Sequence, residues 1–324
     1  MNHPAITQAI AAIAQHQPAI AQRVTESLSI VLQGVQESPW EEVKWCFSRL
    51  TGDGFPVEFT VSSSDDEIRY TAEVAGPEVA ESDRLALAQQ VLDRLGAPAL
   101  PDEIRSRLEI IQASGTLQYG TWLGVRHSQS AKNRDRYKLY CEVPSVRNAV
   151  GDREVEAFMN QIPRLLDCVM TLQMIGYDLS QERLELYLRT DGLEVWELEW
   201  LLRQLETDRS TELVTFVEDL CDRSVSSLIG GSIGLSVSVS LKQEPSILAL
   251  FAPARQWLGR DGEIRSRILN VTGPTSLKTY ANLSQPLAHY TDWNTHHGML
   301  SVVVPPIGPL TLHIGLRPPS TVYT

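Results

Sequence analysis

The sequence has little cysteine and an excess of acidic residues. Its four cysteines are widely spaced, with no Cys-x-x-Cys pair: Cys46, Cys141, Cys168 and Cys221. That spacing argues against a metal site or a disulfide framework and favours a reduced, cytoplasmic protein. Lys and Arg number 28 against 40 Asp and Glu, which gives a formal net charge of −12. Nucleic acid is therefore not an expected partner, because binding it takes a basic surface. A small phosphate ligand needs only a local cluster of cations and is compatible with this charge.

Long apolar runs are also missing. None approaches the roughly 18 to 20 residues of a membrane span. Residues 1–4 (MNHP) lack the basic-then-apolar layout of a secretory signal, so we expect a cytoplasmic protein with no membrane partner. The 324 residues, 43% hydrophobic and 21% charged, are typical of a globular protein. We predict a single domain over residues 1–324, with 1–50 as an N-terminal helical segment packed on it, and a monomer or homodimer.

What the sequence does contain is a regular alternation of strand pairs and helices. Alternating apolar residues predict hairpins at 55–60 with 68–74, 117–125 with 136–143, 172–177 with 183–188, 233–241 with 246–251, and 299–304 with 310–316. Helical spacing predicts helices up to residue 36 and at 40–50, 82–95, 101–113, 153–170, 193–206, 211–221, 254–271 and 276–287.

A unit of two strands and two helices thus recurs at intervals of roughly 50 to 65 residues, which is typical of a repeat-built architecture. The predicted fold class is α+β, with about ten antiparallel strands closed into a barrel and a ring of helices outside. A barrel of that size is wide enough to hold a lumen. A (β/α)8 barrel is the alternative, but it requires single strands alternating with single helices. The hairpins favour the antiparallel barrel.

The first hairpin carries a carboxylate and a guanidinium. Apolar and polar residues alternate in segment 54–60 (GFPVEFT), and Arg69 follows Glu58 by eleven residues. On neighbouring strands of one hairpin, these two side chains are expected to face the same space. A carboxylate inside a sheet is costly unless something uses it. We therefore interpret Glu58 and Arg69 as functional residues, against the alternative of a strand carboxylate that faces solvent.

Two later hairpins place charged and aromatic residues on a shared face. Lys138 and Tyr140 share one face of a strand, and Arg183, Glu185 and Tyr187 share one face of another whose opposite face is leucine. Because the leucine face must meet the outer helices, the charged face is predicted to line the lumen. Cations and phenol rings that converge inside a barrel suit a phosphate-bearing ligand with an organic part. The alternative is an exposed strand face with a surface ion pair of little energetic value.

These segments together resemble the ABBA-fold aromatic prenyltransferases, specifically the indole prenyltransferases similar to dimethylallyltryptophan synthase. The family's P-[LV]-E-[FY]-[ST] strand is matched by residues 56–60 (PVEFT), and its arginine eleven residues after the glutamate is matched by Arg69. Its K-x-Y cluster is matched by Lys138 and Tyr140. Its next cluster, D-L-x…R-[VIL]-K-[IL]-Y, is matched by Asp178, Leu179, Arg183 and Tyr187.

The chain departs from the family pattern at several positions. Glu185 stands where the family has lysine, so one diphosphate-binding cation is lost or replaced. The [QK]-x-Y-x-P strand aligns with residues 249–253 (ALFAP), in which Phe251 keeps the ring without the hydroxyl and Ala249 loses the polar contact. The last strand, of the type P-Y-[LV]-T-x-Y, aligns with residues 309–313 (PLTLH), where His313 replaces a tyrosine. The resemblance spans residues from about 55 to 316.

The resemblance implies a Friedel–Crafts alkylation that transfers a dimethylallyl or geranyl group from its diphosphate to an indole-containing small molecule. Glu58 would be the catalytic residue that accepts the indole N–H. Diphosphate binding would fall to Arg69, Lys138 and Arg183. The allyl cation would be shielded by Tyr140, Tyr187, Phe251 and His313. The short chain and reduced tyrosine set are similar to bacterial enzymes that tailor indole alkaloids, with hapalindole-type alkaloids as a candidate acceptor class.

The chain lacks the DDxxD motif that binds magnesium diphosphate in isoprenoid synthases. We therefore expect no obligatory cofactor or metal, with Mg²⁺ as an accessory in place of the missing cation. Asp65 and Asp66 fall in a predicted turn and are interpreted as solvated surface. His296 and His297 are interpreted as a loop pair, because adjacent strand residues point to opposite faces. For the base that takes the final proton, the sequence offers only His127, at the end of the strand that begins near Trp122.

Two alternatives are left open. One is a non-catalytic barrel that binds an apolar ligand, although convergent cations would then have nothing to neutralise. The other is a phenol or naphthol prenyltransferase of the same fold, which would not need Glu58.

Overall fold

The structure is a computed structural model, and it describes residues 3–129, 135–163, 170–242, 244–272, 277–290 and 296–319. Within these ranges the strands form one closed antiparallel barrel, in which each strand pairs with its neighbours in sequence and β1 closes on β10. The strands are β1 (Val57–Ser62), β2 (Ile68–Glu73), β3 (Thr121–His127), β4 (Asp135–Glu142), β5 (Met170–Asp178), β6 (Arg183–Asp191), β7 (Ser232–Ser240), β8 (Ile247–Pro253), β9 (His297–Val304) and β10 (Thr311–Leu316). The predicted antiparallel barrel is confirmed.

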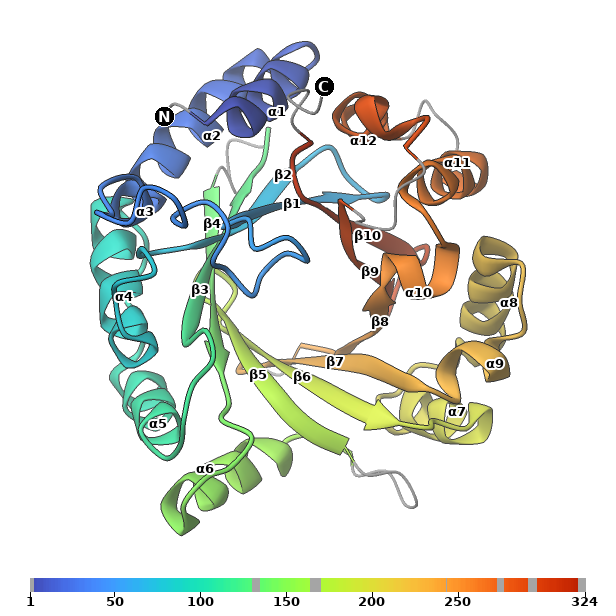
Figure 1. Cartoon of the computed structure of the whole chain (residues 1–324). Helices are drawn as coiled ribbons and strands as arrows, with labels where there is room; N and C mark the ends of the chain where they lie inside the picture. Colours follow the sequence, from blue (N-terminus) through green and yellow to red (C-terminus); the bar gives the residue numbers. More distant parts are fainter. Residues whose placement is uncertain are drawn as a thin grey trace.

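Helices surround the barrel as an outer ring (Figure 1). They are α1 (Pro4–Ala14), α2 (Pro18–Val31), α3 (Gln33–Gln36), α4 (Arg84–Arg94), α5 (Asp102–Gln112), α6 (Ala149–Met159), α7 (Val195–Gln204), α8 (Ser210–Cys221), α9 (Val225–Ile229), α10 (Ala254–Leu258), α11 (Asp261–Thr272) and α12 (Lys278–Leu283), with short 3₁₀ turns η1 (Glu81–Asp83) and η2 (Gln285–Leu287). In the part of the chain that the structure describes, no helix is both long and apolar enough to cross a membrane.

The hydrophobic core lies between the strands and the helix ring. On β6 the residues Leu184 and Leu186 are each 1% exposed and face outward, whereas Arg183, Glu185 and Tyr187 line the lumen. Successive strand side chains point to opposite faces, so this alternation separates an apolar outer face from a polar inner face. The sequence pattern therefore dictates which side chains enter the lumen.

The N-terminal helices are anchored to the barrel by polar contacts as well as by packing. Helix α2 lies against β2 and β3. Ser27 of α2 accepts a hydrogen bond of 2.7 Å from the Tyr70 hydroxyl and lies 2.9 Å from Nε2 of His127. Nδ1 of His127 is 2.7 Å from the Asp135 carboxylate. His127 therefore points out of the barrel toward α2, and its predicted role as the base in the lumen is wrong.

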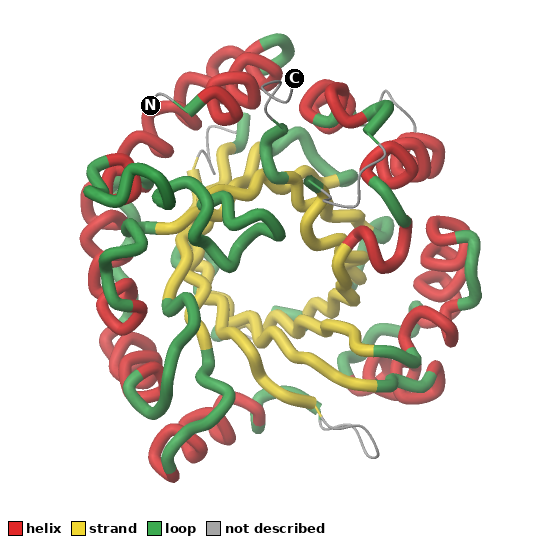
Figure 2. Tube along the Cα trace, viewed as in Figure 1, coloured by secondary structure: helices red, strands yellow, loops and turns green. Residues whose placement is uncertain are grey.

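The predicted helix at 40–50 is also wrong, because this segment forms turns. Ser48 donates from its hydroxyl to the Glu73 carboxylate at 2.6 Å, and the same oxygen accepts from the Leu50 amide at 3.0 Å. Such side-chain hydrogen bonds compete with helical ones. The loop between α3 and β1 instead extends toward the barrel opening (Figure 2), where Arg49 and Leu50 line the cavity described below.

Several predicted boundaries shift for local reasons. Strand β3 begins at Thr121 rather than at 117, because the amides of residues 118–120 wrap around the Glu142 carboxylate. The predicted helix over 254–271 is two helices, α10 and α11, separated at Gly259, whose φ of 94° suits glycine. Parts of the loop predicted at 128–135 and of the helices predicted at 153–170 and 276–287 lie outside the described residues; α6 ends at Met159.

Candidate active site

The barrel encloses a cavity of about 850 Å³ that is lined by inward-facing residues of every described strand. Because the strands are antiparallel, the end of each odd-numbered strand and the start of the next strand meet at the same side of the barrel. One side, which we call the arginine end, carries Arg69, Arg126 and Arg136. The other side, the Glu58 end, carries Glu58 and Trp122. The cavity therefore has two chemically different ends.

Glu58 lies on β1, and its carboxyl group occupies the space beside two glycines, Gly298 and Gly315. A Cβ atom at Gly298 or Gly315 would come within 1.7 Å or 2.5 Å of a Glu58 carboxyl oxygen, so only glycine leaves room for the carboxyl group at these positions. Glu58 is 8% exposed, and among the described residues its Oε2 atom has no hydrogen-bond partner. Burial raises the pKa of this carboxyl to about 8. The group is therefore a buried acid with an unsatisfied oxygen.

Arg69 lies on the neighbouring strand but does not pair with Glu58. The register places Arg69 opposite Thr60 and Glu58 opposite Thr71, so the two side chains are offset along the barrel axis. Both line the same cavity, as the hairpin predicted. Their chemistry is nevertheless separate, with the carboxyl group at one end of the cavity and the guanidinium at the other.

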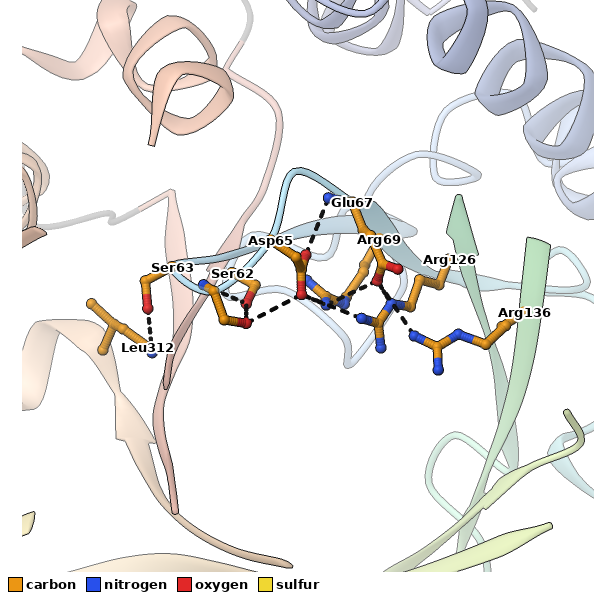
Figure 3. Close-up of polar contacts among 9 residues, drawn as sticks. Ser62, Ser63, Asp65, Glu67, Arg69, Arg126, Arg136 and Leu312 are labelled. Atoms are coloured by element: carbon orange, nitrogen blue, oxygen red, sulfur yellow. Dashed lines mark hydrogen bonds and ion pairs between the residues drawn. The ribbon is translucent and has the colours of Figure 1, made fainter. Parts of the chain in front are cut away.

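At the arginine end, three guanidinium groups converge on two carboxylates of the β1–β2 turn (Figure 3). Arg69 donates to Asp65 at 2.6 Å and to Glu67 at 3.2 Å. Arg126 donates to Asp65 at 3.3 Å and also contacts Glu67, and Arg136 donates to Glu67 at 3.4 Å. These five residues form what we call the arginine cluster.

Asp65 was predicted to be solvated surface, and that prediction is wrong. Its side chain is 25% exposed and is engaged by two guanidinium groups, whereas Asp66 is exposed. Burial alone would raise the pKa of Asp65, but the nearby Arg69 and Arg126 outweigh burial and lower that pKa. Arg126 and Arg136 were not predicted as site residues, although Arg136 precedes Lys138 by two residues and so shares its strand face.

Lys138 is paired inside the lumen with Glu185, the residue that stands in place of the family's lysine. Glu185 also accepts a hydrogen bond of 2.6 Å from Ser236, and Lys138 donates to the Tyr187 hydroxyl at 3.1 Å. Burial by itself would lower the pKa of Lys138, but the Glu185 carboxylate outweighs burial and raises it. The charge of Lys138 is thus balanced within the protein.

Arg183, which was expected to bind diphosphate, is engaged by groups of the protein itself. Within the described chain its guanidinium donates to the hydroxyl and the carbonyl of Ser238 at 3.0 Å, to the carbonyl of Pro245 at 2.9 Å and to Glu244 at 2.9 Å. Arg183 borders the cavity, but its donors are directed at β7 and the segment that leads to β8.

Aromatic rings form a row across alternate strands in the middle of the cavity. The rings of Tyr140 and Tyr187 have centroids 5.9 Å apart, and those of Tyr187 and Phe251 have centroids 6.0 Å apart. The intervening strands carry glycine where the rings lie. A Cβ at Gly176 would come within 3.1 Å of the Tyr187 ring, and one at Gly234 within 2.1 Å of the Phe251 ring. Three of the four predicted shielding residues, Tyr140, Tyr187 and Phe251, are therefore brought together, and the glycines within the strands were a signal for this close approach.

The Lys138 ammonium shows that this row can hold a positive charge. It lies 5.0 Å from the Tyr140 ring centroid and 5.3 Å from that of Tyr187, which is within the range of cation–π attraction. His313 faces the cavity nearer the arginine end. Burial is the larger cause and the charge of Arg69 the next, and together they lower the pKa of His313 to about 3, so its imidazole is neutral.

The Glu58 end has a second aromatic surface. The rings of Tyr119 and Trp122 stack with centroids 3.9 Å apart and an interplanar angle of 15°. The Trp122 indole nitrogen donates to Glu73 at 2.9 Å, and the Tyr119 amide donates to Glu142 at 2.7 Å. These fixed rings form a flat apolar wall of the same cavity that Glu58 lines.

The His296 and His297 pair is a structural feature of the outer layer. Asp261, which is fully buried, accepts hydrogen bonds from both backbone amides and contacts Nδ1 of each ring, at 3.3 Å and 2.6 Å. In the described ranges, no group of three or more His, Cys, Asp or Glu residues is placed to hold a metal ion. The two rings therefore serve to attach the start of β9 to α11.

Comparison with known proteins gives matches only at the level of structure. No family model matches the sequence, and no curated protein does. The prenyltransferase PriB in its apo form matches with a TM-score of 0.73 and 18% identity, over 98% of this chain and 97% of PriB. The 5-dimethylallyl tryptophan synthase of Streptomyces coelicolor, in complex with DMASPP and Trp, matches with a TM-score of 0.75 and 16% identity, over 99% and 94% of the two chains.

The 6-dimethylallyltryptophan synthase of Micromonospora olivasterospora, also in complex with DMASPP and Trp, matches with a TM-score of 0.72 and 18% identity, over 96% of both chains. The three matches each cover nearly the whole barrel and its outer helices. With a closed antiparallel barrel, an outer helix ring and a likeness of this extent, the chain has the fold of the ABBA prenyltransferases.

Proposed function

We propose that the protein is an aromatic prenyltransferase that transfers a dimethylallyl or geranyl group from its diphosphate to an indole-containing small molecule. The observation that carries this proposal is the arrangement of one cavity. A buried carboxyl group, Glu58, lies at one end, the arginine cluster lies at the other, and a row of aromatic rings lies between them. The three parts correspond to an indole, a diphosphate and an allyl cation.

The donor half of the reaction uses the arginine end and the aromatic row. The bond between the allylic carbon and the diphosphate oxygen breaks, and its electron pair leaves with the diphosphate. Guanidinium groups at this end stabilise the departing anion, an effect that is strengthened where water is excluded. The allyl cation lies against Tyr140, Tyr187 and Phe251, whose rings stabilise it by cation–π attraction and exclude water that would quench it.

The acceptor half uses the Glu58 end. The indole stacks on the Tyr119 and Trp122 wall and donates its N–H to Glu58, which otherwise has an unsatisfied oxygen. The hydrogen bond from the indole N–H favours the ionised form of Glu58, whose proton passes to water, and the carboxylate then offsets the positive charge that develops on the ring as an indole carbon attacks the allyl cation. The proton of that carbon passes to the released diphosphate or to water, which restores aromaticity.

The proposal extends to the metal requirement and the acceptor class. The reaction needs no obligatory metal, because guanidinium groups supply positive charge to the diphosphate, and Mg²⁺ acts as an accessory. The acceptor is an indole alkaloid, for which hapalindole-type molecules are a candidate class. Two of the similar structures are dimethylallyltryptophan synthases in complex with DMASPP and Trp, which supports a diphosphate donor and an indole acceptor.

The test is a direct assay. The purified protein is incubated with dimethylallyl or geranyl diphosphate and a panel of tryptophan, simple indoles and indole alkaloids, with and without Mg²⁺. Mass spectrometry should detect a product that has gained one prenyl group. Absence of such a product across the panel would count against the proposal, and prenylation of phenols or naphthols alone would show that the acceptor class is different.

A further inference from the structure

The lumen has a shortage of available cations for a diphosphate. Lys138 is neutralised by Glu185, and the described contacts of Arg183 all go to β7, Glu244 and Pro245. Of the three cations that the family resemblance assigns to the diphosphate, only Arg69 has its guanidinium directed at the arginine end. A single guanidinium is a poor match for an allylic diphosphate, which carries about three negative charges at neutral pH.

Arg126 and Arg136 supply the missing charge at the same place. They come from β3, which is next to β2 in the barrel, and from β4, which follows β3. Both line the cavity together with Arg69. The strand register brings all three together. Arg126 of β3 lies opposite Arg69 of β2 and also opposite Arg136 of β4. Three like charges on adjacent strands repel one another and persist only with an anion between them.

In the structure, the β1–β2 turn supplies that anion. Glu67 contacts all three guanidinium groups and Asp65 contacts two (Figure 3). The two carboxylates do not satisfy the arginines fully. Among the described residues, the buried Nη1 atom of Arg69 and Nε atom of Arg136 have no acceptor. The cluster thus has donors to spare for a ligand with more oxygens than two carboxylates provide.

The carboxylates are also placed where they can leave. Asp65 and Glu67 lie between β1, which ends at Ser62, and β2, which begins at Ile68. Among the described residues, the hydrogen bonds between this turn and β10 lie before the two carboxylates, where Ser63 exchanges bonds of 2.9 Å and 2.8 Å with Leu312. Rotation of the two side chains breaks no hydrogen bond between strands, although Asp65 gives up the bonds of 3.1 Å and 3.2 Å that it accepts from the Glu67 amide and the Ser64 hydroxyl.

We propose that Arg126 and Arg136 complete the diphosphate site with Arg69, and that Asp65 and Glu67 occupy this site until the diphosphate replaces them. This inference rests on the proposed function for the identity of the anion. With both carboxylates in contact, the cluster has a net charge of one; when they leave, its three guanidinium groups match the charge of the diphosphate. One guanidinium group can donate two parallel hydrogen bonds to phosphate oxygens, which suits arginine to this role.

The test is calorimetric titration of the purified protein with inorganic pyrophosphate and, separately, with dimethylallyl thiolodiphosphate. Arg126→Gln and Arg136→Gln should each weaken binding by about 10- to 100-fold, the loss expected for a charged hydrogen bond. Glu67→Gln should tighten binding by about threefold to tenfold, because it removes the competing charge. Arg105→Gln is the matched control for the arginine variants, since Arg105 is on the outer surface and pairs with Asp102.

Each result has one meaning. Unchanged binding in both arginine variants would overturn the assignment of Arg126 and Arg136, and unchanged or weaker binding in Glu67→Gln would overturn the displacement. Thermal unfolding identifies variants that fail to fold, and Arg126→Lys and Arg136→Lys, which keep the charge but lose the forked geometry, should then show an intermediate loss. If pyrophosphate binds in this way but no prenylated product forms, the proposed function fails and the anion site stands. If product forms and the arginine variants bind normally, the inference fails alone.

Discussion

Replacement of Glu58 by glutamine should stabilise the protein while it impairs the reaction. The pKa of Glu58 is raised from 4.5 to about 8 by burial. In the unfolded chain this carboxyl ionises near pH 4.5, whereas in the folded protein it stays protonated up to about pH 8. Between these values the unfolded state binds fewer protons, so folding becomes less favourable as the pH rises. Glutamine has no such dependence.

The size of the effect follows from the shift. At pH 7 the wild-type protein should be less stable than Glu58→Gln by about 3 kcal/mol, an upper value that assumes the full difference of 1.36 kcal/mol for each pKa unit. For a chain of this length, that corresponds to an increase of about 4 °C in the melting temperature. The difference should be absent below pH 4.5, increase up to about pH 8 and then stay constant.

The assay combines thermal unfolding from pH 4 to 9 with measurement of kcat/KM for an indole acceptor. At pH 9, above the pKa of Glu58, Glu58→Gln should lower kcat/KM by about 10- to 100-fold, because the indole N–H loses a charged acceptor. Glu26→Gln, on the exposed face of α2, is the control and should show neither effect. A melting-temperature difference that does not change with pH, or a less stable Glu58→Gln protein, would refute the reasoning about the buried carboxyl.

Other substitutions test the rest of the lumen and its support. Glu185→Gln should lower the free energy of unfolding by about 3 kcal/mol in urea titrations, because it leaves the buried Lys138 ammonium without a counter-ion; an effect below 1 kcal/mol would mean that water reaches this pair. Gly234→Ala should destabilise the protein by about 1 to 3 kcal/mol through overlap with the Phe251 ring, and Phe251→Leu in the same chain should recover part of that loss. Hydrogen bonds, chiefly from His296 and His297, outweigh burial and hold the pKa of Asp261 below its usual value, so its stabilisation is present above about pH 4 and is lost at lower pH. The difference in stability between wild type and Asp261→Asn should therefore shrink as the pH falls below 4, and a constant difference would contradict this account.

Much of the fold could be predicted because its determinants are local. Strand alternation depends only on neighbouring residues, and it correctly placed Lys138, Tyr140 and Tyr187 on the lumen face. The same rule, applied further, would have placed Arg126 and Arg136 in the lumen and His127 outside it. The positions of these three side chains therefore follow from strand alternation alone.

Other features could not be predicted from local sequence. Residues 40–50 have helical spacing, but Ser48 instead bonds Glu73, which lies 25 positions further along the chain. A contact of this kind forms only once the barrel exists. Tertiary contacts of this type override helix propensity, which is weak for a short segment.

The alternation of residues along each strand is enough to establish which side chains share a face, and hence that carboxylates, cations and aromatic rings enter one lumen. Which of these charges are paired depends on the folded barrel. Lys138 meets Glu185 across 47 positions, and Arg136 meets Glu67 across 69, because barrel closure and strand register bring these positions together. Electrostatic energy depends on distance and burial, not on separation along the chain. The pattern of residues therefore predicted a charged lumen, and the three-dimensional register determined where within it an anion can bind.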